Sequence, residues 1–398
     1  MEHGPSGGDH ERHPPDRHRR GGRLSAIGRA GAGGPLLVGA GLRLALHVAG
    51  HRQCDLRDAG AGVRRRPLPG RRDDQQHHLP VRLAGDGGRS PGRRPAGVGR
   101  LEPSEASREG RVVSASKIVV RRIPFAFDEQ IDPVWHPARP EWSHMVNGAS
   151  LAMPYLEPFL IRTVTEALRQ VKDPLLAADA RAFIGQEGVH FQNHRRYNEI
   201  LKRSYPELAG VEAEMEADYA RFQARSLRWR LAYTAGFETM TMGITEWLIH
   251  QRALLFGDAD RSVASLVLWH MVEETEHKTV AFDLYQHLCG GYWPRVWGTL
   301  FAAWHVARAS RKGYRAMLKR DGRWTDWKSR RALWAMVGRF ARHASPAILR
   351  SLSPSYHPSR ARDPDWVDRW FEAYRGLPEG RIPLLDTADP EIPARFST

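Results

Sequence analysis

The segment SVASLVLWHMVEETEHKTVAFDLYQHL (residues 262–288) combines an apolar helical pattern with a highly charged centre. Within it, HMVEETEH (270–277) places five titratable side chains in eight residues. At about 100° per residue, His270, Glu274 and His277 project within one narrow sector of a helix, on its apolar stripe. Burying unpaired charge is costly, so these groups need a counter-charge. A divalent or trivalent metal ion supplies one and uses both residue types as ligands.

A second helical segment, DPLLAADARAFIGQEGVHFQNHRRYNEILKRS (173–204), starts with Asp173 as N-cap and proline at its first helical position. Its apolar stripe includes Glu187 and His190. A Glu-x-x-His pair therefore occurs twice in the chain, about 87 residues apart. A lone pair of this kind is usually solvated on a helix surface, whereas two pairs on apolar stripes indicate a shared site.

Two further helical segments carry acidic residues among apolar ones. NGASLAMPYLEPFLIRTVTEALRQV (147–171) contains Glu157, and RWRLAYTAGFETMTMGITEWLIHQRALLF (228–256) contains Glu238 and Glu246. Glu238 is favoured over Glu246 because its neighbours are apolar, but both stay open. The chain order Glu, Glu-x-x-His, Glu, Glu-x-x-His is that of dinuclear carboxylate sites in helical bundles. We therefore predict an all-α, ferritin-like four-helix bundle with additional C-terminal helices.

Three motifs, AFIGQEGVH (182–190), TAGFE (234–238) and WHMVEETEHKTVAFDLY (269–285), resemble those of the bacterial family named predicted metal-dependent hydrolase. The resemblance extends from about residue 117 to 390. The His-x-x-x-Glu-x-x-His pattern is also similar to that of the p-aminobenzoate N-oxygenase family, in which a third histidine enriches a ferritin-like di-iron site. This similarity implies that His270 is a seventh ligand, and the resulting set is Glu157, Glu187, His190, Glu238, His270, Glu274 and His277.

Three imidazoles with four carboxylates form a hard, oxygen-rich donor set that suits two iron ions, with manganese as the alternative. The favoured function is that of a non-haem di-iron oxygenase, which takes O2 and a small apolar or aromatic substrate. The alternative is hydrolysis by a metal-bound hydroxide. The second alternative is a ferritin-like iron-binding protein. No catalytic side chain outside the metal centre is predicted.

The N-terminal third of the chain differs from the rest in composition. The chain has 398 residues and a formal net charge of +15, and residues 1–115 hold 21 arginines against 12 acidic residues. No Lys, Asn, Phe, Tyr or Trp precedes Lys117. Such a segment cannot easily nucleate a core, so we expect a disordered, dispensable basic tail. Upstream DNA translated in the wrong frame, with the true start near Val112 or Val113, is the other interpretation.

We expect residues 116–290 to form the di-metal bundle and residues 291–398 to form a helical extension packed on it. The tryptophan-rich faces of this extension are expected to cover the bundle, with docking on a membrane surface as the alternative. No segment approaches about 18 uncharged apolar residues. The two cysteines show no disulfide or metal spacing. We therefore expect a cytoplasmic protein without an integral membrane segment or nucleic-acid partner, and a homodimer is compatible with the sequence.

Overall fold

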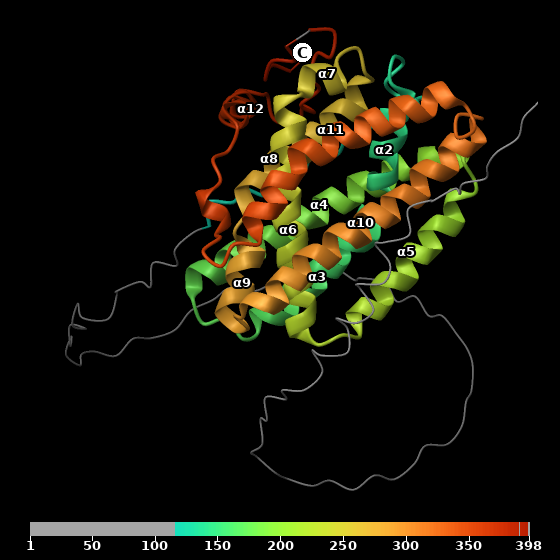
Figure 1. The fold of residues 1–398 in the computed structure, drawn as a ribbon. Helices are drawn as coiled ribbons and strands as arrows, with labels where there is room; N and C mark the ends of the chain where they lie inside the picture. Colours follow the sequence, from blue (N-terminus) through green and yellow to red (C-terminus); the bar gives the residue numbers. More distant parts are fainter. Residues whose placement is uncertain (1–115, 390, 397–398) are drawn as a thin grey trace, which may run out of the picture. The chain divides into compact units, whose positions relative to one another are not determined.

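The computed structural model describes residues 116–389 and 391–396, so the expectations for residues 1–115 lie outside the described residues. In chain order the helices are α2 (Pro140–Ser150), α3 (Met153–Leu168), α4 (Pro174–Ser204), α5 (Leu208–Gln223), α6 (Leu227–His250), α7 (Arg252–Phe256), α8 (Arg261–His277), α9 (Val280–Leu288), α10 (Tyr292–Arg320), α11 (Trp327–Ser351), the short 3-10 helix η1 (Pro358–Arg360) and α12 (Asp365–Arg375) (Figure 1). The described residues contain no β-strand, only a bridge between Leu385 and Phe396. The predicted all-α bundle is confirmed.

Side chains cap the first turns of α4, α6, α8 and α11, whereas α10 begins without a side-chain cap. Asp173 accepts hydrogen bonds from the backbone N–H groups of the second and third residues of α4, at 2.8 and 3.1 Å. Asp260 caps α8 through the Val263 N–H at 3.0 Å. Each cap satisfies donors that have no partner inside the first turn. The capping residues therefore fix where the helices start, as the sequence predicted for α4.

The predicted helix over 147–171 is interrupted between α2 and α3. Pro154 lies in the first turn of α3 and has no N–H to offer to the Ser150 carbonyl four residues earlier. That carbonyl instead accepts a hydrogen bond from Asn198 Nδ2 of α4 at 3.0 Å. The interruption therefore ties the end of α2 to α4.

The predicted helix over 262–288 is also divided, because α8 ends at His277 and α9 begins at Val280. The turn between them points Lys278 toward the C-terminal segment, where its Nζ binds both carboxylate oxygens of Asp363 at 2.8 Å. No glycine or proline marks this turn, so hydrophobic periodicity alone predicted a continuous helix.

Helix α10 crosses α6 and α2 at short distance, which glycine residues permit. A Cβ atom on Gly236 of α6 would lie 2.5 Å from the Thr299 nitrogen of α10. A Cβ atom on Gly148 of α2 would lie 2.9 Å from the Tyr314 nitrogen. Real Cβ atoms do not come this close to backbone, so side chains at these two positions would push α10 away from the bundle.

The tryptophans of α10 do not cover the bundle as the sequence analysis expected. Trp293, Trp297 and Trp304 are exposed, while small side chains such as Ala302 and Ala309 are buried. The buried face of α10 also contains larger residues such as His305 and Met317, so the tryptophans lie on the opposite face of the helix. No helix in the described part of the chain is both long and apolar enough to cross a membrane.

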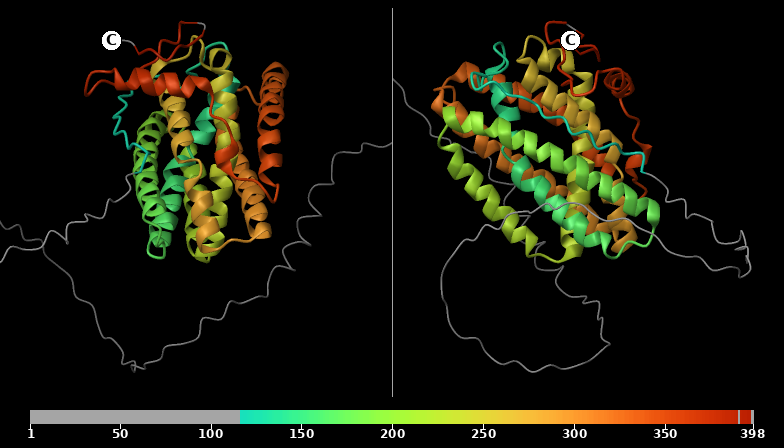
Figure 2. Two further views of the ribbon diagram at one scale, coloured as in Figure 1. Left: turned by 90° about the vertical axis from the view of Figure 1, so that its left-hand side faces the viewer. Right: turned by 180° about the vertical axis from the view of Figure 1, so that it is seen from behind.

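An extended segment, residues 117–127, runs along α4 and is drawn in cyan in the right-hand view of Figure 2. Its buried side chains alternate with exposed ones, and Arg121, Ile123 and Phe125 are the buried members. Asn193 of α4 donates from Nδ2 to the Ile123 carbonyl at 2.9 Å. This anchoring places the Arg121 guanidinium inside the protein.

Candidate metal centre

Seven acidic and histidine side chains from four helices meet inside the bundle. None of them is more than 5% exposed. They are Glu157 from α3, Glu187 and His190 from α4, Glu238 from α6, and His270, Glu274 and His277 from α8. The structure thus brings together every side chain that the sequence analysis proposed as a ligand.

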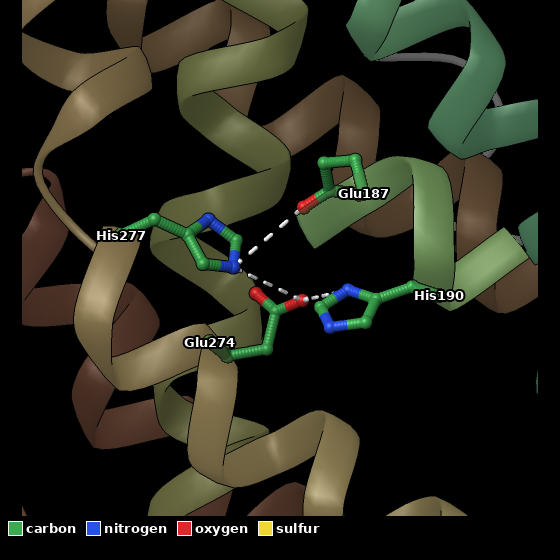
Figure 3. Close-up of side chains that lie close together, drawn as sticks. All are labelled: Glu187, His190, Glu274 and His277. Carbon is green, nitrogen blue, oxygen red and sulfur yellow. Dashed lines mark ion pairs between the residues drawn. The ribbon is translucent and has the colours of Figure 1, made fainter. Parts of the chain in front are cut away.

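Four of these residues, Glu187, His190, Glu274 and His277, form one cluster (Figure 3). The His277 Nε2 atom lies 3.6 Å from Glu187 Oε1 and 3.8 Å from Glu274 Oε1. The His190 Nδ1 atom lies 3.9 Å from Glu274 Oε1. One ligand atom from each residue lies within 4.8 Å of all the others, which is close enough for a single cation to contact all four.

A second cluster consists of Glu157, His190 and His270, and it shares His190 with the first. The His270 Nε2 atom lies 3.7 Å from Glu157 Oε1 and 2.9 Å from Glu274 Oε1. Glu274 Oε1 is therefore near all three imidazoles. The two clusters meet at His190 and Glu274.

The two acidic residues of α6 occupy different environments. Glu238 is 1% exposed, and its Oε2 atom lies 3.5 Å from His277 Nδ1. The Glu246 side chain is 52% exposed and pairs with Arg350 at 3.8 Å. Glu238 therefore borders the candidate metal centre, and Glu246 belongs to the surface.

The buried donors lack the partners that folded proteins normally provide. Neither carboxylate oxygen of Glu157 or Glu187 accepts a hydrogen bond from the described chain, and His190 Nδ1 also has no partner. A buried polar atom left without a partner costs about 1–3 kcal/mol. The seven residues include four carboxylates and neither lysine nor arginine, so two divalent cations would both satisfy these atoms and balance the charge. The donor set fits a metal pair.

Burial and neighbouring charges shift the pKa values of the clustered carboxylates. Burial raises the pKa of Glu157, Glu187 and Glu238 well above the ordinary value, and neighbouring carboxylates raise it further. Burial also raises the pKa of Glu274, but His277 and His270 outweigh it and bring the value below normal. Burial keeps the pKa of His190 well below its usual value. Neutral imidazoles are ready to bind metal, and cations binding here would displace protons from the carboxyls.

Glu273 orients His190 from outside the clusters. Its Oε2 atom accepts a hydrogen bond from His190 Nε2 at 3.0 Å, and its Oε1 atom accepts one from Arg121 at 3.0 Å. With its proton on Nε2, His190 presents the lone pair of Nδ1 to the cluster. Burial raises the pKa of Glu273 to about 8, although Arg121 opposes the rise. Glu273 lies outside the sector shared by His270, Glu274 and His277, so the helical pattern did not mark it as part of the site.

Arg121 also binds Glu276, through contacts of 2.6 and 3.0 Å. Gln186 of α4 donates to the same carboxylate at 2.7 Å. Arg121 was not identified from the sequence, although a signal was present. In the alternating segment 117–127 the other buried side chains are apolar, and Arg121 is the charged exception. A buried arginine requires carboxylates, and α8 supplies two.

A chain of hydrogen bonds orients His270. The Asn198 amide donates to the Ser150 carbonyl, so its oxygen is left to accept from Ser150 Oγ at 2.7 Å. Ser150 Oγ then accepts from His194 Nδ1 at 2.8 Å, and His194 Nε2 accepts from His270 Nδ1 at 2.8 Å. The lone pair of His270 Nε2 consequently faces Glu157 and Glu274. Ser150, His194 and Asn198 all lie outside the seven predicted ligands, and Ser150 and Asn198 were not identified from the sequence.

Comparison with known proteins gives one match. The family described as predicted metal-dependent hydrolase matches residues 119–362. The matched region includes all seven clustered side chains as well as Arg121. Among curated proteins and among solved structures, none matches the chain.

Proposed function

The chain belongs to the family of predicted metal-dependent hydrolases, and we propose that it is a dinuclear metal enzyme that uses two iron ions and O2 to oxidise a small apolar or aromatic substrate. The observation that carries this proposal is the convergence of seven buried side chains, six of which have polar atoms without a hydrogen-bond partner among the described residues. Four carboxylates match the charge of two divalent cations. Manganese is the alternative metal, since it shares the preference for carboxylate and imidazole ligands.

In this proposal the two cations divide the donors between them. Glu187, Glu238 and His277 would hold one cation, and Glu157 and His270 would hold the other. Glu274 and His190 are within reach of both clusters, and His190 would bind one of the cations through Nδ1. Carboxylates suit this task because they change their mode of binding as the charge of the metal changes.

Two bound iron ions would supply the electrons with which O2 is reduced. The protein contributes oriented donors and a dry enclosure. Glu273 and His194 each fix one imidazole with its lone pair toward the centre. The rings of Phe183 and Trp269 pack edge-on against His277 and His190, with centroid separations of 4.9 Å in both cases. An apolar wall of this kind excludes water and protects an oxidising site from side reactions.

Hydrolysis is the second candidate function, and the description of the family favours it. The same donors would hold two cations that activate a water molecule. In that case the protein needs no change in the charge of the metals and no O2.

The first test is the metal content of protein purified without chelators. We expect two iron or manganese ions per chain by elemental analysis. Glu274→Ala removes the donor that lies between the clusters, so its metal content should fall below one ion per chain. Glu246→Ala, the matched change at the surface of α6, should retain two. Wild-type protein with no iron or manganese, or with a single zinc ion, would refute the proposed metal pair.

The second test separates oxidation from hydrolysis. Iron-loaded protein, reduced under anaerobic conditions and mixed with O2, should consume O2 in an oxygen electrode. His270→Ala should keep the helical circular dichroism spectrum and lose most of this consumption. If the wild type instead hydrolyses esters or amides at the same rate with and without O2, and takes up no O2, the hydrolase is the correct assignment.

A further inference from the structure

Helix α10 exposes a row of large apolar side chains. Trp293, Trp297, Leu300 and Trp304 are 66%, 47%, 38% and 50% exposed, respectively. Their spacing of four, three and four residues puts them on one face of the helix. The opposite face of α10 packs on α6 and α2, so the row points away from the bundle. Adjacent exposed tryptophans of this kind mark a surface that contacts another body.

The charges of α10 and α11 all have one sign. α10 contains seven lysine and arginine residues and α11 contains six, and neither helix contains an aspartate or a glutamate. On α10 the exposed face continues beyond the tryptophans with Arg308, Arg311 and Arg315. None of these three arginines pairs with a carboxylate of the described residues, and the Arg308 guanidinium lies 5.7 Å from the centre of the Trp304 ring. The face therefore has an aromatic half and a basic half.

The positive charge of this face argues against two binding partners from the protein itself, a second copy of the chain and residues 1–115. In a two-fold dimer through this face, the row whose unpaired charges are Arg308, Arg311 and Arg315 would meet its own copy, and like charges repel. Residues 1–115 carry more arginines than acidic residues, so they too are a poor partner for a basic face.

We propose that this face of α10 docks on the surface of an anionic lipid bilayer. Tryptophan rings favour the boundary between headgroups and acyl chains, and arginines bind the phosphate groups beside them. Leu300 lies within the row, and its burial in a bilayer would strengthen binding. A nucleic acid binds instead by stacking its bases on flat aromatic rings, which leucine does not provide. Trp327 and Trp334 of α11, which also lacks acidic residues, are exposed as well. Binding is peripheral, because the helix lies along the membrane rather than crossing it.

The proposal is tested with full-length protein and sedimented vesicles. Wild-type protein should bind vesicles of phosphatidylglycerol and phosphatidylcholine in equal parts and should not bind pure phosphatidylcholine. The triple variant Arg308→Gln, Arg311→Gln, Arg315→Gln should bind about a hundredfold more weakly, since each basic residue near the surface contributes about a fivefold factor. The variant Trp293→Ser, Trp297→Ser, Trp304→Ser should also lose binding, and both should keep the wild-type circular dichroism spectrum because every changed side chain is exposed.

The control is Arg181→Gln, Arg195→Gln, Arg203→Gln, which removes the same charge from exposed positions of α4. In the left-hand view of Figure 2, α4 and α11 lie on opposite flanks of the bundle. This control should bind vesicles like the wild type. If the α4 control bound vesicles as weakly as the α10 arginine variant, net charge alone would explain the loss of binding. That result would overturn the proposal. So would binding to single-stranded DNA without binding to vesicles, or a dimer in sedimentation that the tryptophan variant abolishes.

Discussion

Glu273 accepts hydrogen bonds from His190 and Arg121 with its two carboxylate oxygens, so its replacement by glutamine affects both partners. The amide oxygen of Glu273→Gln would remain with Arg121, because the amide nitrogen cannot accept from a guanidinium. The amide nitrogen would then donate to His190 Nε2 and move the imidazole proton to Nδ1. That proton would occupy the lone pair proposed to bind metal.

We therefore predict that Glu273→Gln weakens metal binding about 10–100-fold, as is usual for changes behind a metal-bound histidine. Competition with a chromogenic chelator measures the affinity. Glu246→Gln, the same change at the surface of α6, serves as the control and should leave the affinity as it is. An unchanged affinity in Glu273→Gln would show that Glu273 does not set the state of His190.

Asp321 gives a prediction of pH dependence away from the metal centre. Its Oδ2 atom accepts hydrogen bonds from His144 Nε2 at 2.7 Å and from the Tyr205 hydroxyl at 3.2 Å. Burial raises the pKa of Asp321, but these donors outweigh it and hold the pKa below the ordinary 3.8. The ionised form is thus favoured by folding. Its stabilisation is complete above about pH 4 and is lost as the pH falls through the folded value.

We expect Asp321→Asn to lower the free energy of unfolding at neutral pH by about 1 kcal/mol, a small value because the site is partly solvated. The difference from wild type should shrink as the pH falls below about 4. Urea denaturation at several pH values measures both effects. Glu379→Gln at an exposed position should show no difference at any pH. If the free energy of unfolding of Asp321→Asn were lower than that of wild type by the same amount at every pH, ionisation of Asp321 would not contribute to stability.

At the scale of elements, the crossing of α6 and α10 depends on Gly236. An added methyl group would meet the backbone of α10, which cannot move without disturbing the whole helix. We predict that Gly236→Ala lowers the free energy of unfolding by about 1–3 kcal/mol or more, as overpacking does. It should also weaken metal binding, because Glu238 is two residues away. Chemical denaturation and metal analysis measure these effects.

Gly188 of α4 is the matched control for Gly236. It lies between Glu187 and His190, yet an added Cβ atom there would meet nothing within 4 Å. Gly188→Ala should stabilise the protein by up to about 1 kcal/mol, since alanine is the better helix former. If Gly236→Ala and Gly188→Ala destabilise the protein equally, the contact between α6 and α10 is not the reason for the effect of Gly236→Ala.

The sequence predicted the existence of the long helices better than their continuity. Polar caps and apolar stripes are local signals, so the start of α4 at Asp173 and the inward face of α8 could be predicted. The turn after His277 contains neither glycine nor proline, and its Lys278 pairs with Asp363, 85 residues away. The exposure of Trp304 depends on which face of α10 packs on its neighbours. Local pattern contains neither kind of information.

At the scale of the whole molecule, the proposed cations would join α3, α4, α6 and α8. A ligand that binds only the folded state stabilises it, by about 2.7 kcal/mol at a hundredfold excess over the dissociation constant. For a folded region of this size, that raises Tm by roughly 3–5 °C. Calorimetry before and after removal of metal by a chelator measures the change. Glu274→Ala should show no such shift, and a wild type without one would contradict a metal site in the core.

The convergence of the seven donors could be predicted, because each helix displays its own part of the pattern. Their supporting residues could not. Arg121 reaches Glu273 from a segment with no helical periodicity, and Ser150 reaches Asn198 because Pro154 leaves a carbonyl free. Such partners become visible only when distant segments are placed side by side.

The contact between Arg121 and Glu273 also has a consequence for the time course of synthesis. The two residues are 152 positions apart, so the ribosome must add the whole of α2 to α7 and most of α8 before they can meet. At about 5–20 residues per second, that interval lasts roughly 8–30 seconds. During it, the segment around Arg121 has no carboxylate of α8 on which to dock. The imidazole of His190 therefore takes its metal-binding orientation only late in the synthesis of the chain.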